Sequence, residues 1–170
     1  MNNNPYYGKY RGTVVNNIDP LQIGRIQAMV PDVSGLIPTS WAMPCVPVAG
    51  PNMGVFTVPP IGAGVWIEFE RGDPDYPIWV GGYWGSAAET PKMSNMVPPG
   101  LAGITLQTTL KNGIVISDAP GPTGGILIQT TLGAMISVSD VGIIISNGKG
   151  AIINMTGPTT DVNLGALTVI

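Results

Sequence analysis

Residues 103–118 read GITLQTTLKNGIVISD, and residues 125–140 read GILIQTTLGAMISVSD. The two stretches share QTTL, both end in SD, and the second starts 22 positions after the first. Apolar residues alternate with small polar ones in both, which is typical of β-strands because successive side chains point to opposite faces of a sheet. Ile104 in the first stretch takes the same place as Ile126 in the second. The spacing therefore predicts a repeated β-structure.

Turn-forming residues divide the chain from Gly103 onward into short strand-like runs. Seven such strands, stacked at about 4.8 Å, would extend on the order of 30 Å. The expected strands are residues 103–109, 113–117, 125–131, 134–139, 142–146, 151–155 and 162–169. The charged residues in this part are Lys111, Asp118, Asp140, Lys149 and Asp161.

A single sheet of this kind cannot bury its own apolar face, and its open edges invite aggregation. The ribbon could coil into a solenoid, although three or more similar repeats are usual and only two are clear here. Alternatively, three copies could form a triangular prism, with apolar residues on the axis and strand edges paired between chains. The low charge favours the prism. The predicted trimer axis is lined by Ile104, Leu106, Leu110, Ile114, Ile116, Ile126, Ile128, Leu132, Ile136 and Val138.

The overall composition points in the same direction. Of the 170 residues, 10% are charged, against roughly 25% in a typical globular chain, and 44% are apolar. Such a surface indicates a partner, here another copy of the chain. The net charge of −3, with no basic run, argues against nucleic-acid binding. No signal peptide and no apolar run of about 18 residues is visible, so we expect synthesis in a bacterial cytoplasm.

The first half of the chain carries a different pattern. Across the whole chain, 24 glycines and 17 prolines leave no amphipathic helix of three turns. Short β-rich runs, expected as strands at residues 10–17, 23–30, 41–48, 54–58, 64–70 and 77–84, predict a small closed or nearly closed barrel. The stretch SAAETPKMSNMVPPG at 86–100 has no periodicity and is predicted to be a linker or strap.

A set of residues in the first half follows the pattern of a known family: Asp19-Pro20, Gly24-Arg25, Trp41, Pro47, Ala49-Gly50, Pro59, Ile61-Gly62, Phe69, Gly72-Asp73-Pro74 and Gly81. In order and spacing they resemble the OB-fold domain of contractile-tail central spikes, which include phage baseplate assembly protein V and the spike part of VgrG. The resemblance implies an OB-fold barrel followed by an intertwined homotrimeric, triple-stranded β-helix. We therefore expect an arm at residues 1–9, the OB fold at 10–85, a linker or strap at 86–102 and a needle at 103–170.

The resemblance also implies a function. The chain would be the central spike of a contractile injection machine in a phage or injection particle. It would sit on a separate hub protein, carry a PAAR-like tip protein at Leu167, Val169 and Ile170, and pierce the target membrane when the sheath contracts. Spikes of this kind can hold an apical metal through histidines, but the chain has none, so neither metal nor cofactor is expected.

The sequence offers only weak evidence for catalytic residues. Glu68 and Glu70 would share a strand face like the paired carboxylates of a glycosidase, but no apolar pocket sequence surrounds them. Cys45 lies in an apolar run, where a free cysteine is usually core, and no histidine is available to activate it. The sequence therefore predicts no enzyme. Two other classes stay open: an OB-fold nucleic-acid or glycan module with an oligomerising tail, and an enzyme acting on envelope polysaccharide. Within the mechanical class, a passive fibre or adhesin shaft is an alternative.

Overall fold

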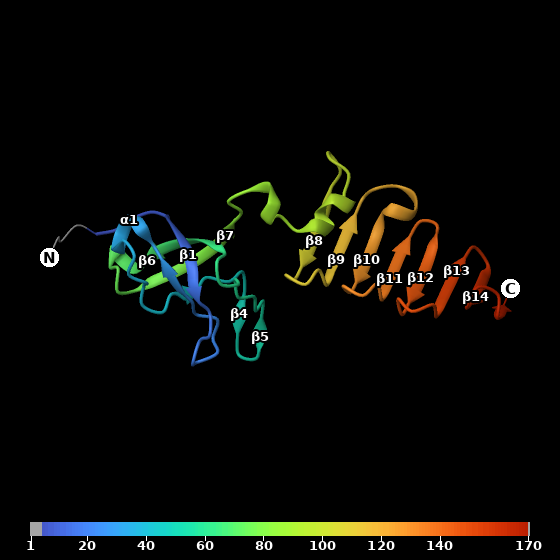
Figure 1. The fold of residues 1–170 in the computed structure, drawn as a ribbon, viewed down its shortest axis with the longest axis horizontal. Helices are drawn as coiled ribbons and strands as arrows, with labels where there is room; N and C mark the ends of the chain where they lie inside the picture. The colour runs from blue at the N-terminus through green and yellow to red at the C-terminus, as the bar shows by residue number, and fades with distance from the viewer. Residues whose placement is uncertain (1–4, 170) are drawn as a thin grey trace. The chain divides into compact units, whose positions relative to one another are not determined.

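The computed structural model describes residues 5–169, and the chain divides into two compact units, Met1–Glu89 and Thr90–Ile170 (Figure 1). Strands and loops dominate both units. The described helical segments are short: α1 (Pro31–Ser34) and the 3-10 turns η1 (Glu70–Gly72), η2 (Ala87–Glu89), η3 (Lys92–Met96) and η4 (Gly121–Thr123). The prediction of an all-β chain is confirmed.

The first unit is built on a five-stranded sheet in the order β2-β1-β6-β7-β3. Residues Ile26 and Ala42, next to the two outer strands, exchange backbone hydrogen bonds of 3.2 and 2.7 Å. This bridge joins the two edges, so the sheet curls into a small barrel. The strands are β1 (Tyr10–Asn16), β2 (Gln27–Met29), β3 (Met43–Pro44), β6 (Gly64–Phe69) and β7 (Pro77–Tyr83), and a separate hairpin is formed by β4 (Ala49–Gly50) and β5 (Met53–Gly54).

Alternation along β6 produces the core of this barrel. Val65, Ile67 and Phe69 point inward and are buried, whereas Trp66 and Glu68 between them are half-buried. The other buried apolar residues of the core are Val14, Ile26, Ala28, Val30, Ala42 and Trp79.

Besides the strand expected at residues 23–30, of which only Gln27–Met29 form a strand, two strands expected in the first unit are much shorter than predicted. Of residues 41–48 only Met43–Pro44 form a strand, and of residues 54–58 only Gly54 does. Proline explains the first case, because Pro44 and Pro47 cannot donate a backbone hydrogen bond to a neighbouring strand. Alternation of residue type alone therefore overestimated the pairing.

The second unit is one eight-stranded antiparallel sheet in which each strand pairs with its chain neighbours (Figure 1). Successive turns consequently alternate between the two long edges of the sheet, which are lined by turns and are distinct from its two outer strands. The strands are β8 (Gly103–Gln107), β9 (Gly113–Ser117), β10 (Gly125–Gln129), β11 (Met135–Ser139), β12 (Gly142–Ser146), β13 (Ile152–Thr156), β14 (Thr159–Val162) and β15 (Leu167–Val169).

Two expectations for this sheet are corrected. The strand predicted at residues 162–169 is two strands, because Asn163 and Leu164 adopt left-handed φ values of 52° and 57° and reverse the chain. The strands predicted at 103–109 and 125–131 each end two residues earlier, at Gln107 and Gln129. Each inner strand pairs with its two chain neighbours, so only β8 and β15 have a free edge within the described sheet, and the pairing of edges between copies stays a prediction. One chain therefore supplies a complete wall.

A strap covers one end of this wall on one face. Met93 in η3 is buried, and its backbone N–H donates to Gln107 Oε1 at 2.8 Å. Beneath the strap, Val115 and Ser117 of β9 are buried as well. The opposite face carries no such cover within the described chain.

Candidate functional site: an exposed aliphatic sheet face

Strand register places aliphatic side chains in two rows along the uncovered face of the second unit. Directly paired residues on neighbouring strands project to the same side of a sheet. The first row consists of Ile104, Ile116, Ile126, Val138, Ile143 and Met155. The second consists of Leu106, Ile114, Ile128, Ile136, Ile145, Ile153, Val162 and Leu167. We call these two rows the aliphatic face.

The aliphatic face is open in a single chain. Ile128, in the middle of the sheet with strands on both sides, still has 44% of its surface exposed, and Leu106 has 63%. An apolar surface that runs over all eight strands is far more continuous than the scattered apolar residues of ordinary protein surfaces. It identifies this face as an interaction surface.

The structure places the predicted axis residues in two groups. Eight of the ten lie on the aliphatic face, whereas Leu110 and Leu132 lie in turns, with 72% and 81% of their surface exposed. The sequence analysis missed part of the face on the later strands: Ile143, Ile145, Ile153, Met155 and Val162. In GIIIS, three successive isoleucines conceal the alternation that would have identified Ile143 and Ile145.

The tip residues expected at the end of the sheet are partly described. Leu167 begins β15 and has 58% of its surface exposed, and Val169 is the last residue of that strand. Ile170 lies outside the described residues. Leu167 pairs with Val162 and so extends the second row of the aliphatic face to the last strand.

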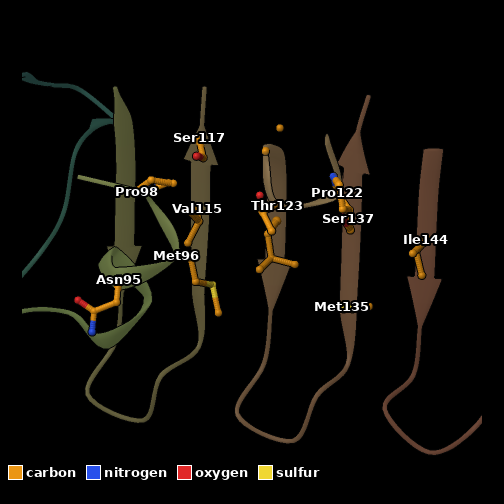
Figure 2. Close-up of a pocket in the computed structure, with 13 residues that line it drawn as sticks. Asn95, Met96, Pro98, Val115, Ser117, Pro122, Thr123, Met135, Ser137 and Ile144 are labelled. Carbon is orange, nitrogen blue, oxygen red and sulfur yellow. The ribbon is translucent and has the colours of Figure 1, made fainter. Parts of the chain in front are cut away.

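The opposite face of the sheet carries a groove of about 540 Å³ (Figure 2). Met96 and Pro98 from the strap lie over one end, and Pro122 and Thr123 of η4 border it (Figure 2). Its floor is formed by Val115, Leu127, Met135, Ser137 and Ile144. No titratable side chain is among the residues that line the groove, so it offers no group for acid–base chemistry.

In the first unit, Asp19 organises the loop that follows β1. Its two carboxylate oxygens accept the backbone N–H groups of Leu21, Ile23 and Arg25, at 3.0, 3.0 and 3.2 Å. Oδ1 of Asp19 also accepts hydrogen bonds from Nε and Nη2 of Arg25, at 3.0 and 2.7 Å. The Arg25 guanidinium lies 5.4 Å from the ring centre of Trp41. The Arg25 guanidinium, helped by these backbone N–H groups, holds the pKa of Asp19 well below its usual range, although burial opposes the shift.

Replacing Asp19 by asparagine should destabilise the first unit and reduce its acid sensitivity. Because the folded-state pKa of Asp19 is lowered, its contribution is present above the unfolded pKa of about 3.9 and is lost as the pH falls through the folded value. The amide would also present a donor where backbone N–H groups now donate. Thermal unfolding between pH 7 and pH 2 measures both effects.

Asp73→Asn is the matched control, because within the described residues the Asp73 side chain accepts only the Asp75 N–H, through Oδ1, and an amide oxygen can do the same. An Asp19→Asn variant with the stability and pH profile of the wild type would contradict the role given to this carboxylate.

The tryptophans of the first unit differ in their surroundings. Trp79 lies in the barrel core, and its Nε1 donates to the Gly24 carbonyl at 3.0 Å. Trp66 is half-buried and stacks with Tyr83, with Arg11 lying over both rings at 5.5 and 5.3 Å. Trp84 has 63% of its surface exposed. Core packing thus accounts for Trp79 alone.

The Gly72-Asp73-Pro74 motif anchors the start of the described chain. The Gly72 carbonyl accepts the Tyr6 N–H at 2.8 Å, and a Cβ at Gly72 would come within 2.6 Å of Pro5 Cβ. Only glycine lets the two segments approach this closely. Pro20, which follows Asp19 in the same family pattern, is exposed in the loop that Asp19 organises.

The two candidate glutamates do not share a strand face. Strand β6 ends at Phe69, so Glu70 belongs to the turn η1, and Glu68 forms an ion pair with Lys9. The strand predicted at residues 64–70 is therefore one residue too long, and the arrangement proposed for a glycosidase is absent.

Cys45 is exposed rather than buried, which corrects the expectation that it belongs to the core. It follows the short strand β3, and its backbone N–H donates to Trp79 O at 2.9 Å. Among residues 5–169, no group of three or more His, Cys, Asp or Glu side chains is placed to hold a metal ion. None of the helices in that part of the chain has the length and apolar character of a membrane span.

Comparison with known families assigns both units. Residues 10–84 match the type VI secretion system/phage-baseplate injector OB domain, and residues 103–168 match the phage baseplate V C-terminal trimerisation domain. No curated protein sequence matched. The fold and these domains define a structural protein of the baseplate of phage or type VI injection particles. The chain belongs to the spike-like baseplate V proteins, and its second unit is a homotrimerisation domain.

Proposed function

We propose that the chain is the central spike of a contractile injection machine, with three aliphatic faces closed around a common axis. The observation that carries this proposal is the continuous aliphatic face on a domain of the trimerising family. Three identical walls can bury that face against one another, whereas a single wall leaves it in water. The intertwined β-helix expected from the resemblance is one form of such an assembly.

The hydrophobic effect is large enough to hold the three walls together. Completing the burial of a half-exposed Ile, Leu or Val contributes about 1 kcal/mol, since full burial contributes about 1.5–3 kcal/mol. Over the two rows this amounts to on the order of 10 kcal/mol for each chain. Association costs of about 4–15 kcal/mol oppose this gain. Three chains together gain on the order of 30 kcal/mol against the cost of two association steps, so burial of the aliphatic face favours the trimer.

A trimer of this kind is suited to mechanical work. Every inner strand of each wall is paired on both sides, and most connecting turns are short. We propose that the OB barrels seat the trimer on a hub protein and that β15 meets a tip protein. Contraction of the sheath then drives the trimer through the target membrane. The role is structural, without catalysis.

The assembly state is the first test. Light scattering on a gel-filtration peak should give three times the mass of one chain, and the trimer should survive mild detergent because its contacts are enclosed. A monomer at micromolar concentration would overturn the proposal.

Membrane puncture needs its own experiment. In a Cys45→Ser background, Asn154→Cys places a label on β13, on the sheet face opposite the aliphatic face. In particles mixed with target vesicles, contraction should move this label to a place that an external, membrane-impermeant quencher cannot reach. A label that stays fully quenchable after contraction would leave a trimeric baseplate protein without the piercing role.

A further inference from the structure

The charges in the turns of the eight-stranded sheet are sorted between its two long edges. One edge consists of the turns at residues 108–112, 130–134, 147–151 and 163–166, and it carries Lys111 and Lys149. The other consists of the turns at residues 118–124, 140–141 and 157–158, and it carries Asp118 and Asp140. We call these the lysine edge and the aspartate edge. Within β8–β15 the remaining charge, Asp161, lies on a strand and accepts the Gly165 N–H at 2.6 Å.

None of the four edge charges has an ionic partner within the described part of its own chain. The ion pairs there are Lys9–Glu68 and Arg25–Asp19, both in the first unit. All four side chains are exposed. Lys111 and Asp118 cannot reach each other within one chain, because β9 spans about 17 Å between the two edges.

Along the sheet, each of these lysines lies within about one strand spacing of one aspartate on the other edge. Lys111 lies in the β8–β9 turn and Asp118 at the start of the next turn, one strand spacing further along, or about 4.8 Å. Lys149 lies in the β12–β13 turn and Asp140 in the preceding one, so this offset runs in the opposite direction. A lysine side chain spans such a distance.

We propose that neighbouring copies in the trimer meet head to tail, the lysine edge of one against the aspartate edge of the next. Lys111 then pairs with Asp118 of the adjacent copy, and Lys149 with its Asp140. The opposite offsets favour zero translation between copies. A shift by one strand would bring one pair level and move the other to about 10 Å. Rotation without translation closes a ring instead of producing an open filament.

The same charges disfavour other contacts. A two-fold contact through matching edges would bring lysines against lysines or aspartates against aspartates. Exposed ion pairs add little affinity, so the aliphatic face supplies the binding energy and the edges select orientation and register. This inference deepens the proposed function, because it names the contacts by which the trimer closes.

Zero-length carbodiimide coupling, which joins an amine to a carboxylate in contact with it, tests the pairing on the unmodified protein. The expected products are covalently linked trimers containing the isopeptides Lys111–Asp118 and Lys149–Asp140. Each of these can form only between copies, because the partners lie on opposite edges of one sheet. Mass spectrometry of the digested trimer band identifies them.

Charge exchange supplies the control. Lys111→Asp with Lys149→Asp should lose both links and give a lower yield of trimer at low salt. Adding Asp118→Lys and Asp140→Lys to that variant should restore both. If the wild-type protein is a trimer by light scattering but gives neither link, the edge pairing is wrong while the proposed function stands. If it is a monomer, both fail.

Discussion

Replacing Ile128 by aspartate should leave the chain monomeric. Ile128 lies in the second row of the aliphatic face, on β10 near the middle of the sheet, with Ile114 and Ile136 as its paired neighbours. In a closed trimer, three carboxylates would meet near the axis without partners. Each buried, unpaired carboxylate costs several kcal/mol, so three cost on the order of 10 kcal/mol. Light scattering at micromolar concentration measures the loss of the trimer.

Gln129→Asp is the matched control, because Gln129 is the next residue on the same strand and points to the opposite face. Both variants place aspartate in β10, so any general weakening of the strand is shared. We expect the Gln129→Asp variant to remain trimeric. Normal trimers from Ile128→Asp would show that the aliphatic face is not the trimer contact, whereas monomers from both variants would assign the loss to a weakened β10.

The second unit could be read from its sequence because one signal dominates there. Short apolar runs bounded by turn residues specified β9 (GIVIS) and β12 (GIIIS) at the predicted bounds, 113–117 and 142–146. This signal failed where the backbone conformation of a turn determined the end of a strand. At residues 163–166 the backbone reverses through left-handed residues that include Leu164, a residue type that alternation counts as strand.

Packing that links distant segments could not be predicted in the same way. The strap at η3 covers β9 because Met93 is buried over that strand and its N–H meets Gln107. Neither contact has a local sequence signal. The exposure of Cys45 likewise depends on how β3 ends after only two residues. A short apolar run in the sequence shows that its side chains are hydrophobic, but it does not show which other segment of the chain covers them.

The organisation of the Asp19 loop shows an intermediate case. The family pattern singled out Asp19 and Arg25, but their spacing alone did not give the carboxylate its backbone partners. The sorting of charge between the two sheet edges needed the strand order as well, because it depends on which turns fall on the same side. The sequence identifies the charged residues, and the strand order determines which of them lie on the same edge of the sheet.

Gly125→Ala should disrupt the sheet of the second unit and lower its stability by more than about 4 kcal/mol. Gly125 opens β10 with a φ of 82°, and a Cβ there would lie 2.0 Å from the carbonyl oxygen of Val138 on β11. Backbone cannot give way as the end of a flexible side chain can, so the β10–β11 pairing must shift. Denaturant unfolding followed by circular dichroism, at equal protein concentration, measures the change.

Gly133→Ala separates this clash from the cost of a left-handed backbone. Gly133 has a φ of 85°, close to that of Gly125, but the nearest atom to its added Cβ is 3.9 Å away. It should therefore lose only about 1–2 kcal/mol, the usual cost of a left-handed residue with a side chain. Equal losses in the two variants would mean that the Val138 carbonyl moves freely, and the tight pairing of β10 with β11 would then not hold the wall together.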